Sequence, residues 1–146
     1  MTPQSCLIVE DSMFDQRLMT RMVEQTEQSI SVRIAETLED ARRALGEGPV
    51  SLILLDNNLP DGKGANFALE LSKHQDWARI PIIIVSDWPS PFMWQKAQLA
   101  GVSQVVNKSD FRPEMIVSAL PEQISLKQCH RGAGPGSKKW RRGARS

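Results

Sequence analysis

The sequence predicts a doubly wound α/β fold built on a five-stranded parallel sheet. Short apolar runs alternate with amphipathic segments along the chain as far as Ile124, which is typical of strands interleaved with helices that cover both faces of a sheet. The apolar runs are nearly continuous, as expected for strands that are buried on both faces. A length of 146 residues fits a single domain.

The first half of the chain contains three of the predicted strands, at residues 6–9, 31–36 and 51–56. The helix after the first strand is indicated by one apolar face, formed by Phe14, Leu18, Met22 and Val23. Ser12 followed by Asp15 resembles a capping box, which places the start of that helix just after Glu10 and Asp11. The next two helices are predicted from Thr37 to about Gly46 or Gly48, with Thr37 and Asp40 as the capping pair, and at about residues 64–74.

The second half contains the other two strands, at residues 80–86 and 103–107. A helix over about residues 91–100 should end at Gly101, since glycine readily adopts a left-handed helix end. A last helix begins after Asp110, and Pro121 kinks or ends it. Five strands in so short a chain favour the flavodoxin-like strand order 2-1-3-4-5, a (βα)5 arrangement.

Charge divides the chain into a predicted domain at residues 1–125 and a basic tail at 126–146. Seven of the 18 basic residues follow Ile124 with no acid among them, which leaves 11 basic against 17 acidic residues before it. The tail lacks apolar periodicity, so we expect it to be disordered, and it is too short for a DNA-binding output domain. Three functions stay open for it: a solvated extension, a contact between Trp140 with its basic neighbours and nucleic acid or an anionic membrane, or a contact with the acidic domain.

The apolar runs are too short to cross a bilayer, and no leader pattern opens the chain. Cys6 and Cys129 do not form a disulfide framework, so we expect a cytoplasmic protein. The two histidines, His74 and His130, are isolated from any acidic motif and are interpreted as surface residues.

Polar residues gather where the predicted strands end. In an open α/β sheet the carboxyl ends of the strands hold the functional site. We therefore expect one rim to collect six side chains: Glu10, Asp11, Asp56, Ser86, Asp87 and Lys108.

Adjacent carboxylates repel each other unless a cation is present, and Mg²⁺ prefers such hard oxygen ligands. Asp56 as a nucleophile, Lys108 as a positive charge and Ser86 as a hydroxyl donor are the groups needed to accept and hold a phosphoryl group.

Four motifs, VEDS, LLDNNLPDGKG, IIIVSD and NKSD, occur in an order that resembles the receiver domain of bacterial response regulators. The resemblance covers about residues 5–124. It implies that Asp56 accepts a phosphoryl group from a sensor histidine kinase or a histidine phosphotransfer protein. It also implies a Mg²⁺ site at Asp56, at Asp11 directly, at Glu10 mostly through water and at the backbone carbonyl of Asn58. Ser86 would hydrogen-bond the phosphoryl oxygen, and Lys108 would pair with the phosphoryl group.

Three residues depart from the family pattern. Val105 replaces the aromatic residue that usually moves inward on activation, so Trp88 or Phe92 is a candidate for that role. Ser109 replaces a proline that usually follows the lysine in a cis peptide bond, so we expect a trans bond here and a different direction for Lys108. Asp87 replaces a small residue, where it would slow phosphorylation, bind a second cation or point outward. The segment SDWPSPFMW either forms a docking surface or packs Trp88 and Trp94 over the edge of the core.

We therefore expect a stand-alone response regulator that binds an output protein through the helix at 91–100, the strand at 103–107 and the last helix. It would act as a switch with self-directed phosphoryl transfer, and not as a metabolic enzyme. The alternative is an adaptor with the receiver fold, held in one state by Val105, Ser109 and Asp87. A phosphatase of the haloacid dehalogenase type is disfavoured, because that family needs an aspartate where this chain has Asn58.

Overall fold

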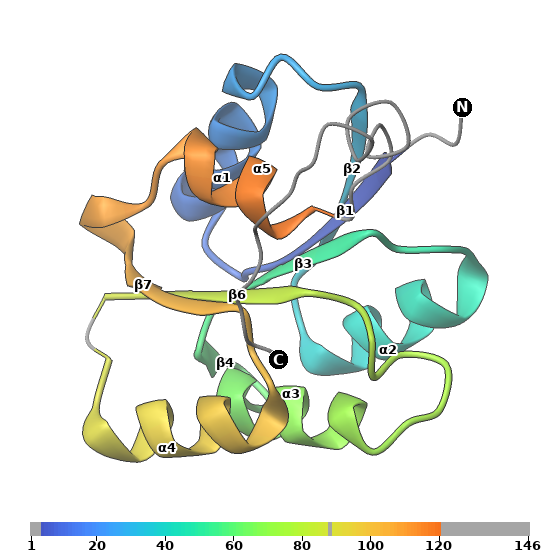
Figure 1. Cartoon of the computed structure of the whole chain (residues 1–146), viewed down its shortest axis with the longest axis vertical. Helices are drawn as coiled ribbons and strands as arrows, with labels where there is room; N and C mark the ends of the chain where they lie inside the picture. The colour runs from blue at the N-terminus through green and yellow to red at the C-terminus, as the bar shows by residue number, and fades with distance from the viewer. Residues whose placement is uncertain (1–3, 88, 121–146) are drawn as a thin grey trace, which may run out of the picture.

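The computed structural model describes residues 4–87 and 89–120, and it has a parallel five-stranded sheet at its centre (Figure 1). The strand order is β2-β1-β3-β6-β7, which confirms the predicted 2-1-3-4-5 order of a doubly wound fold. The strands of this sheet are β1 (Gln4–Val9), β2 (Ile30–Ala35), β3 (Leu52–Leu55), β6 (Ile82–Ser86) and β7 (Gln104–Asn107). All four of its pairings are parallel.

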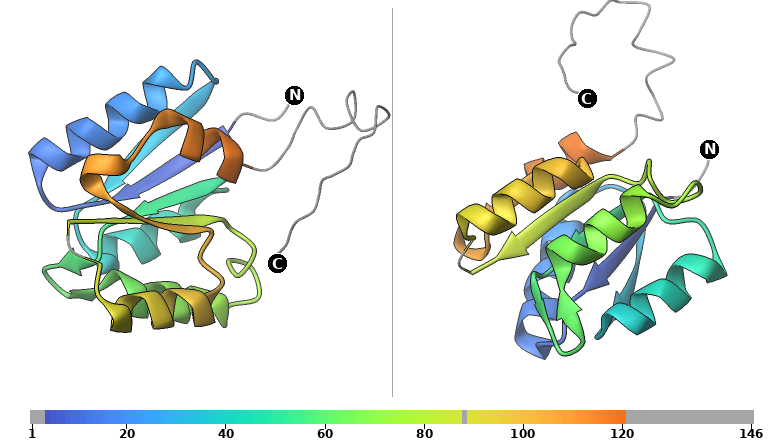
Figure 2. Two further views of the ribbon diagram at one scale, coloured as in Figure 1. Left: turned by 60° about the vertical axis from the view of Figure 1, so that its left-hand side comes forward. Right: turned by 90° about the horizontal axis from the view of Figure 1, so that it is seen from below.

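Helices cover both faces of the sheet (Figure 2). Helices α1 and α5 lie on one face, and α2, α3 and α4 lie on the other. The helices are α1 (Met13–Gln25), α2 (Leu38–Glu47), α3 (Gly64–Ser72), α4 (Pro91–Ala100) and α5 (Pro113–Ala119). A short 3₁₀ helix, η1 (Lys108–Asp110), precedes α5.

The ends of the helices follow the predicted capping signals. The Ser12 hydroxyl accepts a hydrogen bond from the Asp15 N–H, and the Thr37 hydroxyl accepts one from the Asp40 N–H. Gly101 ends α4 with a φ of 74°, in the left-handed region where glycine is favoured. Local sequence therefore determines where these helices begin and end.

The predicted apolar face of α1 is wrong at its first position. Phe14 is 76% exposed, whereas Gln16, Met19 and Val23 are the buried residues of this helix. The burial of Gln16 is tolerated because its side-chain amide donates to the Glu10 carbonyl at 2.8 Å. A hydrogen-bonded polar side chain therefore occupies a buried position on α1, while the apolar Phe14 lies at the surface.

A small antiparallel hairpin after β3 was not predicted. It joins β4 (Asn58–Leu59) to β5 (Gly62–Lys63). Strands of two residues give no periodicity to detect in a sequence, and this hairpin shapes the loop that follows Asp56.

Two apolar clusters, one on each face of the sheet, hold the helices in place. Strands β1, β3 and β6 run through the middle, with their apolar side chains at most 5% exposed. Their carboxyl ends are thereby fixed at one edge of the sheet. Within the described part of the chain, no helix has the length and apolar character needed to cross a membrane. The predicted tail at 126–146, with Cys129, His130 and Trp140, lies outside the described residues, as do Pro121 and Trp88.

Candidate functional site

The carboxyl ends of the central strands bring the predicted acidic residues together. Glu10 and Asp11 follow β1, and Asp56 follows β3. The sheet's hydrogen bonding continues into both positions, since the Glu10 N–H donates to the Ala35 carbonyl and the Asp56 N–H donates to the Val9 carbonyl. Backbone pairing therefore fixes Glu10 and Asp56, which are 1% and 5% exposed, while Asp11 is exposed at the mouth of the site.

These three carboxylates lie close enough together to hold one metal ion. One ligand oxygen from each of Glu10, Asp11 and Asp56 lies within 4.8 Å of the other two. Carboxylate oxygens at such mutual distances suit a hard divalent cation such as Mg²⁺, which typically takes one or two carboxylates together with water and phosphate oxygens. The residues at this rim therefore fit the predicted ion.

The loop after Asp56 is held by hydrogen bonds to its own asparagines. The Asn57 side chain accepts from the Ala65 N–H at 3.0 Å, at the start of α3, and the Asn58 N–H donates to Asp56 Oδ2 at 3.2 Å. The Asn58 side chain turns toward the hairpin, where its Oδ1 accepts from Lys63 Nζ at 2.6 Å. Asn57 and Asn58 thus have structural partners, and a metal contact through the Asn58 carbonyl stays a prediction.

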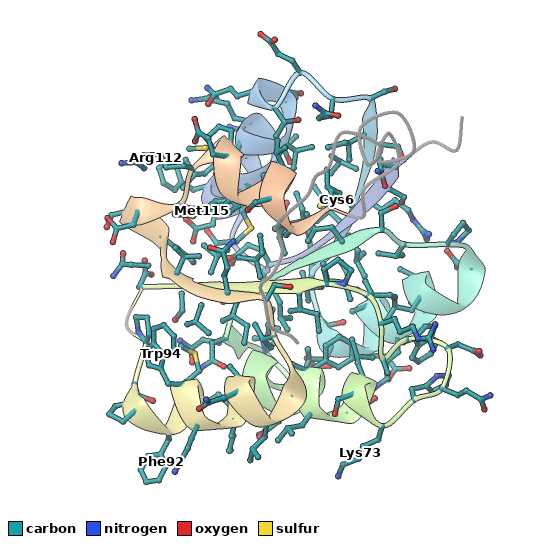
Figure 3. The ribbon with its side chains drawn as sticks, viewed as in Figure 1. Cys6, Lys73, Phe92, Trp94, Arg112 and Met115 are labelled. Carbon is teal, nitrogen blue, oxygen red and sulfur yellow. The ribbon has the colours of Figure 1, made fainter. Side chains whose placement is uncertain are left out.

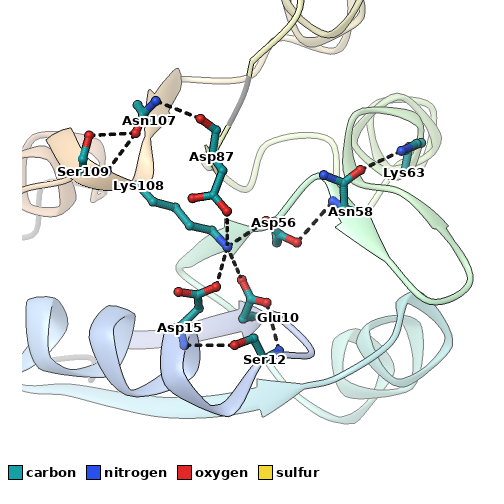
Figure 4. A network of polar contacts seen from close by, with 10 residues as sticks. All are labelled: Glu10, Ser12, Asp15, Asp56, Asn58, Lys63, Asp87, Asn107, Lys108 and Ser109. Atoms are coloured by element: carbon teal, nitrogen blue, oxygen red, sulfur yellow. Dashed lines mark hydrogen bonds and ion pairs between the residues drawn. The ribbon is translucent and has the colours of Figure 1, made fainter.

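Lys108 reaches the same rim and contacts four carboxylates (Figure 4). Its Nζ lies 2.6 Å from Asp15, 3.1 Å from Glu10 and 3.3 Å from Asp56, and the outermost carboxylate, Asp87, is 3.9 Å away. The Lys108 side chain is only 10% exposed. An ammonium group this buried and this well paired neutralises part of the acidic site.

Burial and charge shift the pKa values of the site in opposite ways. Burial raises the pKa of Glu10 to about 7. Burial also raises the pKa of Asp56, although Lys108 opposes that shift. Burial alone would lower the pKa of Lys108, but its hydrogen bond to Asp15 and the charges of Asp56 and Glu10 outweigh burial and raise it. These contacts therefore favour the charged form of Lys108, while burial makes Glu10 easier to protonate than an ordinary glutamate.

Ser86 brings a hydroxyl that lacks a partner among the described residues. It ends β6, pairs across the sheet with Asn107, and is 1% exposed. Its Oγ is buried and makes no hydrogen bond within the part of the chain that is described. A buried hydroxyl without a partner is unfavourable, so this atom is positioned to donate to an oxygen that arrives with a ligand.

The Lys108–Ser109 peptide bond is trans, as predicted, since the described residues contain no cis peptide bond. The Ser109 N–H and hydroxyl both donate to Asn107 Oδ1, while Asn107 Nδ2 donates to the Asp87 carbonyl at 2.9 Å. Asn107 thereby links the loop after β6 to the turn after β7. The Asp87 carboxylate is 62% exposed and lies on the Lys108 side of this loop.

Of the two residues expected to replace the missing aromatic switch, Phe92 lies at the surface of α4, whereas Trp88 is outside the described residues. Val105 is partly buried against the core. Phe92 and Trp94 of α4 are 77% and 51% exposed (Figure 3). Together with Pro91, Gln95 and Gln98 they line a shallow hollow. Trp94 therefore does not simply pack into the core, and a docking role for this surface stays a prediction.

Asp15 is the site residue that the sequence reasoning missed. Its spacing from Ser12 predicts only half of a capping box, but its carboxylate makes the shortest contact to Lys108 among the described residues. In a full capping box the Asp15 carboxylate would accept from the Ser12 N–H. Here that N–H donates to Glu10 Oε2 instead, at 3.0 Å. A usable signal existed: a helix that follows a parallel strand begins at the same edge of the sheet, so acids in its first turn belong to the rim.

Comparisons with known proteins agree with this geometry. The sequence pattern of the response regulator receiver domain matches residues 6–120. The transcriptional regulatory protein CitB of Klebsiella pneumoniae is 41% identical over 68 residues, which span 47% of this chain and 27% of CitB. The chain thus matches about a quarter of the length of that relative.

Solved structures share the fold at lower sequence identity. The CheY-like receiver domain protein of Methanospirillum hungatei JF-1 superposes with a TM-score of 0.68 at 20% identity, over 88% of this chain and 94% of that one. The Mn²⁺-bound response regulator Rcp1 superposes with a TM-score of 0.69 at 23% identity, over 92% of this chain and all of that one. Chemotaxis response regulator CheY4 of Vibrio cholerae gives 0.67 at 21% identity, over 89% of this chain and 98% of that one.

Proposed function

The chain belongs to the response regulator receiver domain family, and on that basis we propose that it is a phosphorylation switch whose acceptor is Asp56. Receiver domains of this family accept a phosphoryl group on an aspartate in the presence of Mg²⁺. The donor would be a histidine kinase or a histidine phosphotransfer protein. The observation that supports this best is that the buried Asp56 carboxylate lies in one cluster with Glu10 and Asp11, and that its Oδ1 also lies 3.3 Å from Lys108 Nζ.

The reaction would be an in-line displacement at phosphorus. An Asp56 carboxylate oxygen forms the new O–P bond while the N–P bond of the phosphohistidine breaks, and the imidazole leaves with the electron pair of that bond. The nucleophile must be ionised, and the Lys108 ammonium favours the ionised form of Asp56. A Mg²⁺ ion held by Glu10, Asp11 and Asp56 would supply positive charge for the phosphoryl oxygens.

The chain's own residues would then hold the product. The Ser86 hydroxyl, which has no hydrogen-bond partner among the described residues, would donate to a phosphoryl oxygen, and Lys108 would pair with the added negative charge. Hydrolysis of the acyl phosphate by water resets Asp56. This is self-directed chemistry with no external substrate turned over, so we infer a signalling protein and not a metabolic enzyme.

Output would depend on a partner protein that binds to α4, β7 and α5, where Phe92 and Trp94 are exposed. The alternative is an adaptor that does not cycle, which the substitutions at Val105, Ser109 and Asp87 favour. The contact between Lys108 and Asp56 supports cycling, because it forms although Ser109 stands where the family usually has proline.

Intact mass spectrometry after incubation with Mg²⁺ and acetyl phosphate tests the proposal. We expect the wild-type protein to gain one phosphoryl group and Asp56→Asn to gain none. Asp76→Asn is the matched control, since it removes an exposed carboxylate far along the chain from the site. EDTA should abolish the gain. A wild-type protein that stays unmodified under these conditions would contradict the switch and favour the adaptor.

A further inference from the structure

The ammonium of Lys108 is shared between the phosphoacceptor and a residue of α1. Asp15 Oδ2 lies 2.6 Å from Lys108 Nζ, closer than any of the other three carboxylates around it (Figure 4). Both side chains are largely enclosed, with 19% of Asp15 and 10% of Lys108 exposed. Charge-assisted hydrogen bonds of this length are among the stronger side-chain contacts, more so away from water.

Lys108 needs acceptors around its ammonium group to stay in one position, and Asp15 is the nearest of them among the described residues. A lysine side chain has a flexible four-carbon stem and three rotatable donors, with no preferred fork geometry. Its backbone lies in the short 3₁₀ helix η1, next to the Asn107–Ser109 hydrogen bonds. Asp15, by contrast, is held in the first turn of a 13-residue helix whose N-cap is Ser12.

We propose that Asp15 is a positioning residue that holds the Lys108 ammonium beside Asp56, ready for the incoming phosphoryl group. The proposal rests on the proposed phosphorylation of Asp56. Glu10 also bonds Lys108, but it belongs to the acidic cluster that would hold the metal, so Asp15 is the partner that remains available to the lysine throughout the cycle.

The distances argue against the opposite effect, in which Asp15 withdraws Lys108 from the acceptor. Lys108 Nζ is 3.3 Å from Asp56 Oδ1 while it is bonded to Asp15. The two contacts therefore coexist. An ammonium group has three N–H donors, so a phosphoryl oxygen on Asp56 can be reached without breaking the bond to Asp15.

The first test measures Lys108 directly and needs no phosphorylation. Reductive methylation in EDTA, followed by peptide mass spectrometry, reports how strongly each lysine amine is protected, with the exposed Lys73 as the internal reference. We expect Asp15→Ala to raise methylation of Lys108 by about tenfold, as the loss of a charge-assisted hydrogen bond implies. Asp15→Asn should raise it less, since an amide oxygen still accepts the bond.

Asp87→Asn is the matched control for charge. It also removes one carboxylate from the surroundings of Lys108, but that carboxylate is 62% exposed and 3.9 Å away. We expect its effect on Lys108 methylation to stay within about twofold, because exposed ion pairs contribute little. Unchanged protection in Asp15→Ala, or an equal rise in Asp87→Asn, would overturn the proposal.

The second test measures the rate of phosphorylation by acetyl phosphate at saturating Mg²⁺. We expect Asp15→Ala to slow it by about tenfold and Asp15→Asn to retain most of the wild-type rate. A merely structural role of Asp15 in the first turn of α1 would change thermal stability, but the phosphorylation rate of Asp15→Asn would not recover relative to Asp15→Ala. Raised methylation with an unchanged rate in Asp15→Ala would also overturn the proposal.

The two tests separate this proposal from the proposed function. If the wild-type protein accepts no phosphoryl group while Asp15→Ala exposes Lys108, the contact is supported and the phosphorylation of Asp56 is refuted. If the wild-type protein is phosphorylated and Lys108 keeps its protection in Asp15→Ala, the switch is supported and the role of Asp15 is refuted.

Discussion

The rim of the sheet has two halves that differ in how they are built. The acidic half, from the ends of β1 and β3, consists of Glu10, Asp11 and Asp56, and it has the residue types expected for the receiver family. The switch half, from the ends of β6 and β7, departs from the family pattern at Asp87, Val105 and Ser109. Two residues of the acidic half, Glu10 and Asp56, are at most 5% exposed, whereas the substituted residue Asp87 of the switch half has a carboxylate that is 62% exposed.

This difference separates two requirements of a phosphorylation switch. Accepting a phosphoryl group needs carboxylates at fixed distances, which the pairing of central strands supplies. Responding to the phosphoryl group needs groups that can change partners, and Ser86 and Lys108 are available for that on the other half. Under the proposed switch, the acidic half would supply the chemistry, while the substitutions at Asp87, Val105 and Ser109 fall on the half that would respond. We therefore expect the two halves to react differently to substitution.

The largest effect is expected at Gly64, which follows the hairpin on the acidic half. A Cβ at this position would lie less than 3.0 Å from the Asp56 carbonyl oxygen, closer than real Cβ contacts. Because the obstacle is backbone, Asp56 itself would have to move. We expect Gly64→Ala to lower the free energy of unfolding by about 3 kcal/mol or more, measured by urea denaturation.

Gly46→Ala is the matched control for this glycine. Gly46 lies in α2, and no atom comes within 4 Å of a Cβ placed on it. Alanine should raise the free energy of unfolding there by about 0.5–1 kcal/mol, because glycine is unfavourable within a helix. A loss of stability at Gly46 as large as that at Gly64 would show that the enclosure of Asp56 is not the cause.

The next effect concerns pH and again the acidic half. The pKa of Glu10 is about 7 in the folded protein, against an ordinary value of 4.5. Between these values the folded state binds more protons than the unfolded state, so stability falls as the pH rises from about 4.5 to about 7. In EDTA we expect the free energy of unfolding to fall by about 2 kcal/mol over this range. Urea denaturation at a series of pH values measures this change.

Two changes should remove this dependence. Glu10→Gln replaces the titrating group with a neutral one of the same size, so its stability should vary less over the same range. Mg²⁺ at saturation should also flatten the curve, because a bound cation favours the ionised carboxylate. A wild-type curve in EDTA that rises between pH 4.5 and pH 7 would contradict the assignment.

The smallest effect is expected on the switch half, at Ser86. Its buried Oγ has no partner among the described residues, so Ser86→Ala should raise the free energy of unfolding of the unphosphorylated protein by about 1 kcal/mol. Thermal or urea denaturation can measure this gain. The same variant should hold its phosphoryl group less well, since the hydroxyl is the donor proposed for the phosphoryl oxygen.

Ser51→Ala provides the contrasting serine. The Ser51 hydroxyl accepts from the Ser5 N–H at 3.0 Å, so its removal leaves a backbone donor unpaired and should lower stability by about 1 kcal/mol. Equal destabilisation of Ser86→Ala and Ser51→Ala would show that the Ser86 hydroxyl already has a hydrogen-bond partner. It would then not be free to donate to a phosphoryl oxygen, contrary to our proposal.

The sequence by itself determined the order of the strands, the caps at Ser12 and Thr37, and the meeting of Glu10, Asp11, Asp56 and Lys108 at one rim. These follow from local signals, because apolar runs, capping residues and the direction of parallel strands are all encoded within short stretches. Only the tertiary structure decided which carboxylate lies closest to Lys108, that Gln16 is buried while Phe14 is exposed, and that the Ser86 hydroxyl has no partner within residues 4–87 and 89–120. Each of those depends on contacts between residues far apart in the chain or on different elements, such as Asp15 and Lys108, and no local pattern fixes such distances.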